Sequence, residues 1–426
     1  MANSFSKEER VAFEDLLEGF QDALVLSRNV SVYNTDSTMM ERSNNTIWRP
    51  QPYIAQSINS TPGTAISSYQ GMTQLAVPAT LGFSKTVPFE LTTLELRDSL
   101  QEGRLGDSAK QKLASDINIA IMNAAAGLGS LVVPIAAASG DYDDIALCDA
   151  IMNEQGVPDY DRFLALSSRD YNGLAGNLAV ATRSFGNAKS EKAYERSFVG
   201  MVAGFDTYKM DYANRQTAAA GGGALTIDTD GAGTQANFLP QATSTSVGGQ
   251  INVDNRFQVV TVSATTSVAA GDAFTIAGVF AVHHITKQST GQLKTFRVVS
   301  VNSGTTMTIT PPIIGATPTP TDAQLQYKNV AVETASNTAA IVFLNVNTAS
   351  VNVFWQRDSL EILPGRYAVP SDAGVAVMRA ATDQGIELVM QKFYDIDSMT
   401  IKYRLDTLFG VVNKAPEQSG ILLFNQ

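Results

Sequence analysis

A segment of about 120 residues in the second half of the chain differs sharply in composition from the sequence on either side. Between positions 222 and 341 only 11 of 120 residues are charged, against 60 of the remaining 306. Val, Thr, Ser, Ile and Gly dominate and alternate as in β-strands, whereas the flanking sequence carries amphipathic helical patterns. This break predicts an all-β domain, here called the insert (residues 222–341), placed within a fold of a different kind.

Three glycines mark the point where the chain enters the insert. Gly221, Gly222 and Gly223 precede Ala224 and Leu225, without the Lys and the Ser or Thr that a phosphate-binding loop requires. We therefore interpret the glycines as a flexible hinge. Strands within the insert are expected at 258–264, 273–285, 294–301 and 305–310, the last two joined by a hairpin turn.

The first 28 residues contain one strongly amphipathic helix. Its expected range is 6–28, because apolar side chains recur there every three or four positions after a Ser and a Glu spaced as in a capping box. Two interpretations are open: the apolar stripe contacts a partner, or it packs on the chain's own domain. Leu16, Leu17 and Phe20 are the candidates for contact with a partner.

The helical period is absent from residue 29 to residue 88, where Ser, Thr, Asn, Gln, Gly and Pro predominate. About 60 residues with so little core-forming pattern are too many for an ordinary loop in a compact domain. We expect an extended arm or β-hairpin that a neighbouring molecule covers, and Trp48 is a further candidate for that contact.

Helical periodicity returns after this arm. We expect a helix at 91–100, an interruption at Gly103 and Gly106, and a second helix at 108–127, about 30 Å long. Short helices (142–154, 169–183, 190–194) and strands (198–205, 351–355, 359–363, 387–394, 399–412) are expected in the rest of the flanking sequence. Together the patterns predict an α+β fold.

Residues able to support catalysis or bind a metal are scarce. The two histidines, His283 and His284, are adjacent in an expected strand, so their side chains would face opposite sides of the sheet. Cys148 has no basic neighbour to activate its thiol and is expected to be buried. Acidic clusters at 141–144 and 228–231 lack the complete ligand set of a calcium loop. We therefore expect no enzyme activity, no metal and no cofactor.

The charge of the chain limits its partners. The formal net charge is −11 and no run of Lys or Arg occurs, which argues against specific binding of nucleic acid. An acidic protein can still enclose nucleic acid without adhering to it. No apolar stretch approaches the roughly 20 residues that span a bilayer. The N-terminus is charged where a signal peptide would be apolar, so folding in the cytoplasm is expected.

Short motifs in the same order and nearly the same spacing resemble a known family. They include Glu41-Arg42-Ser43-Asn44-Asn45-Thr46-Ile47-Trp48, Val202-Ala203-Gly204-Phe205-Asp206, Val253-Asp254-Asn255-Arg256-Phe257 and Asn352-Val353-Phe354-Trp355. Between residues 41 and 355 these motifs resemble the coat proteins of short-tailed phages of the P22 type, whereas the rest of the C-terminal sequence is similar only loosely. The resemblance implies a tailed-phage major capsid protein with the Hong Kong 97-like fold.

The resemblance also implies a division of the chain into parts. Such a fold has an N-terminal arm, an extended E-loop, a peripheral domain with a long spine helix, and an axial domain, and this family adds an inserted all-β barrel. The corresponding ranges are 1–40 (arm), 41–90 (E-loop and start of the peripheral domain), 91–221 (spine helix and axial domain), 222–341 (insert) and 342–426 (return to the axial and peripheral core).

The function that the resemblance implies is structural. Such proteins assemble in the bacterial host cytoplasm, as hexamers and pentamers, into an icosahedral shell. Scaffolding and portal proteins are partners, and the virion encloses double-stranded DNA without sequence-specific contacts and without a membrane. In the family a charged loop of the insert reaches neighbouring subunits. The matching stretch 241–250 is uncharged here, and Ser244, Ser246 and Gln250 are its candidate contacts. The alternative is a β-rich binding or host-attachment protein, which requires exposed aromatic residues in the insert.

Overall fold

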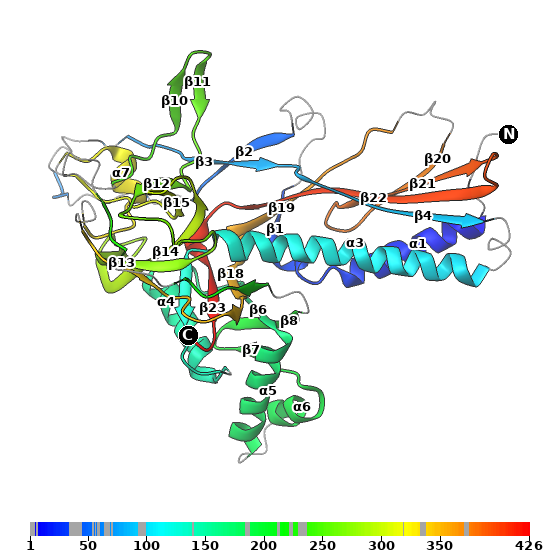
Figure 1. Ribbon diagram of the computed structural model, residues 1–426, viewed down its shortest axis with the longest axis horizontal. Coiled ribbons are helices and arrows are strands. Elements are labelled where there is room, and N and C mark those ends of the chain that lie inside the picture. The colour runs from blue at the N-terminus through cyan, green and yellow to red at the C-terminus, as the bar shows by residue number, and fades with distance from the viewer. Residues whose placement is uncertain are drawn as a thin grey trace. The chain divides into compact units, whose positions relative to one another are not determined.

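The computed structural model divides the chain into two compact units. The first comprises Met1–Ile47, Pro78–Met122 and Leu360–Val412, and the second comprises Trp48–Val77, Asn123–Ser359 and Asn413–Gln426. The structure describes residues 5, 7–33, 45–52, 55, 57, 60–63, 69, 71–92, 99–138, 140–183, 188–210, 214–220, 225–228, 237–317, 319–332, 338–369 and 375–426. The expected hinge, Gly221, Gly222 and Gly223, lies outside these residues. Figure 1 labels the helices and strands.

The first unit combines helices with an extended sheet. Its helices are α1 (Lys7–Ala23), η1 (Ser27–Asn29) and most of α3 (Ser99–Leu128). The sheet has the order β1-β19-β22-β21-β20, with β4 also paired to β22. The strand bounds are β1 Ser31–Val32, β4 Phe83–Thr92, β19 Leu360–Pro364, β20 Ala376–Ala381, β21 Glu387–Asp395 and β22 Thr400–Asn413. Strand β22 is central, because it pairs antiparallel with both β4 and β21.

The helices of the first unit differ from the expected ranges in two respects. Helix α3 runs without a break through Gly103 and Gly106, so the expected interruption is wrong. Leu91 and Thr92 belong to β4, so a helix beginning at residue 91 is also wrong. Helix α1 ends at Ala23, five residues earlier than expected.

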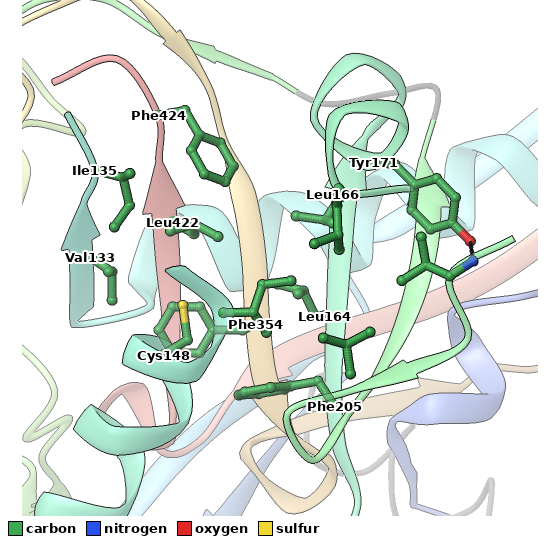
Figure 2. Packing of buried hydrophobic residues seen from close by; sticks show 14 of the residues in the cluster. Val133, Ile135, Cys148, Leu164, Leu166, Tyr171, Phe205, Phe354, Leu422 and Phe424 are labelled. Carbon is green, nitrogen blue, oxygen red and sulfur yellow. Dashed lines mark hydrogen bonds between the residues drawn. The ribbon is translucent and has the colours of Figure 1, made fainter. Parts of the chain in front are cut away.

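A mixed six-stranded sheet forms the centre of the second unit. Its order is β5-β23-β18-β6-β8-β7, with parallel pairs β5–β23 and β6–β8. The bounds are β5 Leu131–Pro134, β6 Arg162–Ser167, β7 Met201–Val202, β8 Phe205–Met210, β18 Asn352–Gln356 and β23 Ser419–Leu423, and the helices are α4 Tyr142–Glu154, α5 Ser168–Arg183 and α6 Ala188–Arg196. Figure 2 shows the apolar core of this sheet, in which Phe354 and Phe205 meet edge to face and Cys148 is buried as expected.

The described part of the insert contains a five-stranded antiparallel sheet of order β12-β15-β14-β13-β16. The bounds are β12 Gln258–Thr261, β13 Ala273–Val282, β14 Ser289–Val301, β15 Thr306–Thr310 and β16 Ile341–Phe343, with the short helix α7 at Asp322–Tyr327. Strands are present at all four expected places, but β12 and β13 end three residues earlier than expected and β14 begins five residues earlier. The expected hairpin between β14 and β15 is confirmed. Phe274, Ile276 and Phe296 are fully buried in the apolar core of the insert.

Three strand pairs and two short helices complete the described structure. The pairs are β2 (Thr46–Pro50) with β3 (Ala76–Thr80), β9 (Arg215–Gln216) with β17 (Ala349–Ser350), and β10 (Thr243–Ser246) with β11 (Gly249–Asn252); the helices are η3 (Arg357–Ser359) and η4 (Pro416–Gln418). Because β9 precedes the insert and β17 follows it, their pairing brings the entry and exit of the insert together.

Candidate assembly surfaces

The hairpin β10–β11 carries the three candidate residues of the insert. Thr243 pairs with Asn252 and Ser246 with Gly249, so that residues 247 and 248 form the tip. Figure 1 shows the hairpin extending away from the five-stranded sheet of the insert. Ser246 and Gln250 are exposed and Ser244 is half-buried. The structure therefore brings all three candidates together on one projecting element.

The same hairpin has exposed apolar side chains and no charged residue between positions 241 and 250, as expected for a contact that does not use salt bridges. Val247 at the tip is fully exposed, and Ile251 is 53% exposed. Among the described strands, β10 and β11 pair only with each other. An isolated two-stranded hairpin is marginally stable in water, so contact with a further surface would stabilise it through backbone hydrogen bonds and burial of these apolar side chains.

The candidates on α1 and β2 lie in different surroundings. Leu16 and Phe20 are buried within the chain, with 8% and 0% of their surface exposed. The burial of Leu16 and Phe20 agrees with the second interpretation, in which the apolar stripe packs on the chain's own domain. Their assignment as contacts with a partner is therefore corrected. Leu17 and Trp48 are half-buried, and their contact with a partner stays a prediction.

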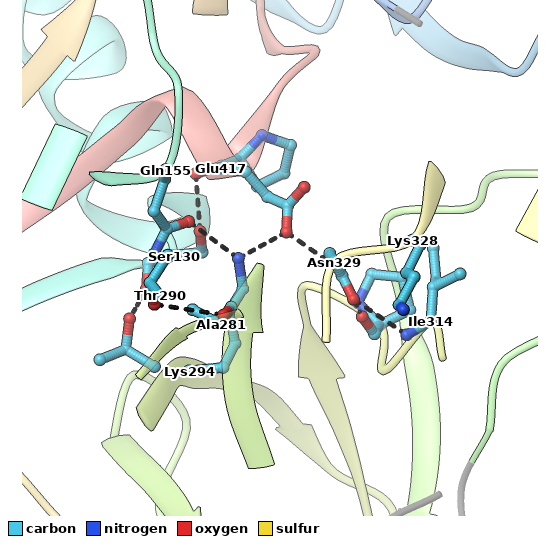
Figure 3. A network of polar contacts seen from close by, with 12 residues as sticks. Ser130, Gln155, Ala281, Thr290, Lys294, Ile314, Lys328, Asn329 and Glu417 are labelled. Atoms are coloured by element: carbon cyan, nitrogen blue, oxygen red, sulfur yellow. Dashed lines mark hydrogen bonds and ion pairs between the residues drawn. The ribbon is translucent and has the colours of Figure 1, made fainter. Parts of the chain in front are cut away.

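A buried polar network, which the sequence analysis missed, joins the insert to the rest of the second unit (Figure 3). The Lys294 ammonium on β14 donates to Glu417 Oε1 at 2.7 Å and to Gln155 Oε1 at 3.0 Å. Asn329 Nδ2 donates to the same Glu417 oxygen at 2.9 Å and to the carbonyl oxygen of Pro312. Lys294 is 1% exposed, so its charge is balanced inside the protein by the Glu417 carboxylate.

Two further contacts place the insert beside the six-stranded sheet. The Thr295 hydroxyl donates to the carbonyl oxygen of Ser130 at 2.6 Å, and the His284 amide donates to the carbonyl oxygen of Gln155 at 2.9 Å. Lys294, His284 and Glu417 also line a cavity of about 80 Å³. Five separate parts of the chain, around Ser130, Gln155, Lys294, Asn329 and Glu417, thus meet in one group of polar residues.

The histidines lie in a turn rather than in a strand, because β13 ends at Val282. Nδ1 of His283 accepts hydrogen bonds from the amides of Ile285 and Thr286. Burial, with Lys287 nearby, lowers the pKa of His284 to about 4. Burial also lowers the pKa of Lys287 to about 8. His284 is therefore neutral at neutral pH.

Glu417 remains ionised although it is largely buried. Burial acts to raise its pKa, but Lys294, His284 and hydrogen bonds from Lys294 and Asn329 outweigh that effect and lower the pKa overall.

In the acidic cluster 141–144, the Asp144 carboxylate accepts a hydrogen bond from the Asp141 amide at the start of α4. Asp141 and Asp144 therefore form a capping box at the N-terminus of α4. Within the described residues no group of three or more His, Cys, Asp or Glu side chains is arranged to bind a metal.

The depressed pKa of His284 predicts a loss of stability in acid. The unfolded chain takes up a proton on this histidine near pH 6.5, whereas the folded chain does so only near pH 4. Because the unfolded state binds more protons between these values, the free energy of unfolding should fall as the pH drops from 6.5 to 4. Urea unfolding at pH 7 and pH 5 measures this fall, which should be smaller in His284→Gln. An equal fall in both proteins would contradict the assignment to His284, whose titratable neighbours are His283, Lys287, Lys294 and Glu417.

Comparison with known proteins identifies the family. Residues 1–425 match the family described as P22 coat protein, gene protein 5. The chain belongs to this family. It is therefore a major capsid protein, a structural component of a phage virion. No helix in the described part of the chain is long and apolar enough to cross a membrane.

Several solved capsid structures are similar to the chain. The "CUS-3 coat protein I-domain" is 41% identical, covering 29% of this chain and 96% of that one, with a TM-score of 0.22. A structure titled "Mycobacterium phage Che8" is 9% identical over 94% of this chain and 90% of that one, with a TM-score of 0.45. The mature capsid of bacteriophage PhiM1 is 10% identical over 100% of this chain and 88% of that one, with a TM-score of 0.42. The family assignment itself rests on the match over residues 1–425.

Proposed function

We propose that this coat protein assembles as hexamers and pentamers into an icosahedral shell that encloses double-stranded DNA. The family match over residues 1–425 carries the proposal. Assembly on a scaffolding protein in the host cytoplasm, and a portal protein in the completed shell, are parts of the same proposal. The net charge of −11 supports enclosure without adhesion, because an acidic wall repels the phosphate backbone.

A Hong Kong 97-like arrangement is the proposed architecture. Helix α3 corresponds to the spine helix, the β2–β3 pair to the base of the E-loop, and the six-stranded sheet to the axial domain. The antiparallel five-stranded sheet supports the proposal that the insert, residues 222–341, is the family's inserted β-barrel. Residues 1–40 correspond to the N-terminal arm and 342–426 to the return into the core.

The projecting hairpin β10–β11 is the proposed contact between the insert and a neighbouring subunit. Its free edges, its exposed Val247 and its candidates Ser244, Ser246 and Gln250 support that role. The host-attachment alternative has less support, because Phe274, Phe296 and Tyr327 of the insert are buried, and Phe280, at 38%, is its one aromatic side chain among the exposed described residues.

Assembly with a scaffolding protein tests both the function and the hairpin contact. We expect closed shells in negative-stain images of the unmodified chain. Val247→Asp should raise the protein concentration needed for shells about tenfold, because burying an unpaired charge costs more than 1.4 kcal/mol. The matched control Val259→Asp changes another exposed valine of the insert, on β12, and should assemble normally.

Two results would contradict these proposals. Persistent small oligomers of the unmodified chain would favour the host-attachment alternative. Shells that form equally well with Val247→Asp and Val259→Asp would refute the hairpin contact while leaving the capsid function intact.

A further inference from the structure

The short helix α7 of the insert contacts an extended segment that is distant in sequence. Asp322 and Gln326 are one helical turn apart, so their side chains share a face. The Gly71 amide donates to Asp322 Oδ2 at 3.0 Å, and the Thr73 amide donates to Gln326 Oε1 at 3.0 Å. Gln326 Nε2 donates back to the carbonyl oxygen of Gly71 at 2.8 Å. The buried Gln326 amide thus bonds to the backbone as a neighbouring strand would.

The contact continues along the same segment. The Leu75 amide donates to the Tyr327 hydroxyl at 3.2 Å, and the Leu75 side chain, 1% exposed, packs with Tyr327 and Ile314. Ala76 then forms a parallel β-bridge with Asp254. The bonded amides at residues 71, 73 and 75 alternate, as expected for an extended strand bound along one side.

The contact with α7 and Tyr327 involves the backbone of this segment and one of its side chains, that of Leu75. Met72 is 69% exposed and Gln74 is also exposed, so neither side chain is enclosed at this contact. Gly71, by contrast, is favoured by close approach, because a Cβ atom there would lie 2.5 Å from Asp322 Oδ2 and the carboxylate would have to move away from the amide that it binds. The selected features are therefore a glycine, an extended backbone and a leucine four residues later.

We propose that α7 and the adjoining Tyr327–Ile314 surface form a peptide-docking groove whose ligand is the segment 71–76 of the same chain. Docking fixes the position of the chain just before β3, at the end of the segment that connects β2 to β3. The insert would thereby hold the end of this connecting segment in place. Continuity supports an occupant from the same chain: Leu75 leads directly into β3, and its carbonyl oxygen accepts from the Gln51 amide, which follows β2. A second copy of the chain is the other conceivable occupant.

Hydrogen exchange of the unassembled full-length subunit, followed by mass spectrometry, tests this proposal. Gln326→Leu removes both backbone bonds and should accelerate exchange in residues 71–76 about tenfold, the change expected when about 1.4 kcal/mol of protection is lost. Exchange in β13 and β14 should not change. The control Gln292→Leu replaces an exposed glutamine on β14 and should leave residues 71–76 protected.

A variant on the segment itself keeps the test independent of the folding of the insert. Gly71→Ala should accelerate exchange at Thr73 and Leu75 by steric conflict with Asp322, and Asp322→Ala in the same chain should restore their protection. Unchanged exchange in both Gln326→Leu and Gly71→Ala would overturn the proposal, as would acceleration spread equally over β13 and β14. Loss of the wild-type protection on about hundredfold dilution would also overturn it, because a second copy would then supply the segment. Since no shell is formed in these measurements, failure of assembly does not affect their outcome.

Discussion

Replacing Lys294 with Met should reduce the free energy of unfolding of the subunit by about 3 kcal/mol. The substitution keeps much of the side-chain volume but removes the ammonium that donates to Glu417 and Gln155. Glu417 would then keep the Asn329 donor but lose its ion pair. We place the effect at the low end of the range for broken buried pairs because the Glu417 side chain retains 28% exposure. Urea unfolding followed by the fluorescence of the buried Trp355 measures it.

Two companion variants separate the buried ion pair from a general effect of losing a lysine. Lys402 pairs with Asp395 at 2.9 Å on the surface, where it is 49% exposed, so Lys402→Met should leave stability unchanged. The double substitution Lys294→Met with Glu417→Leu should recover most of the loss, because no unpaired charge is then buried. Equal unfolding midpoints for Lys294→Met and Lys402→Met would contradict the importance of the buried pair.

Locally encoded elements were predicted well from the sequence. Helix α4 matches its expected range at both ends, because its apolar period and its acidic start are both local signals. Helix α3 was predicted less well, since Gly103 and Gly106 each cost only about 1 kcal/mol in a helix. The buried Leu113 and Ile117 show where the packing that offsets this cost occurs.

The buried network and the peptide groove depend on contacts that no local pattern encodes. Lys294 and Glu417 are 123 positions apart, and α7 has only six residues, too few for a periodic signal. The composition of the insert nevertheless gave one indication of buried ion pairs. Of the few basic residues of the insert, Arg256, Lys294 and Arg297 are all buried. Buried charged side chains usually have partners, so ion pairs such as Arg256 with Asp254 and Lys294 with Glu417 were to be expected, although the identity of the partners was not.

For α1 the helix itself was predictable from the sequence, but the surface that its apolar stripe contacts was not. Its spacing predicted the helix, but periodicity alone does not distinguish a stripe that meets a partner from one that packs within the chain. The structure makes that distinction through Asn118 of α3, whose side chain accepts from the Leu26 amide and donates to the Ala23 carbonyl oxygen. The end of α1 is thereby bonded to α3, and its stripe is buried in the same unit.

Replacing Phe20 with Ala should therefore destabilise the unassembled subunit by about 3–5 kcal/mol, the usual cost of removing a buried aromatic ring. Urea unfolding measures this loss, and shell assembly should fall in proportion to it, because the ring is not at a surface. Val11→Ala, on the same helix but 58% exposed, is the matched control and should change neither property.

The half-buried Leu17 decides whether any part of α1 meets a partner. If Leu17 contacts a scaffold or a neighbouring subunit, Leu17→Ser should reduce assembly more than its effect on subunit stability explains, whereas Phe20→Ala should not. If both variants lose assembly only in proportion to stability, the stripe acts solely within the chain. Assembly that survives Phe20→Ala together with an unchanged unfolding midpoint would instead contradict the burial of this ring.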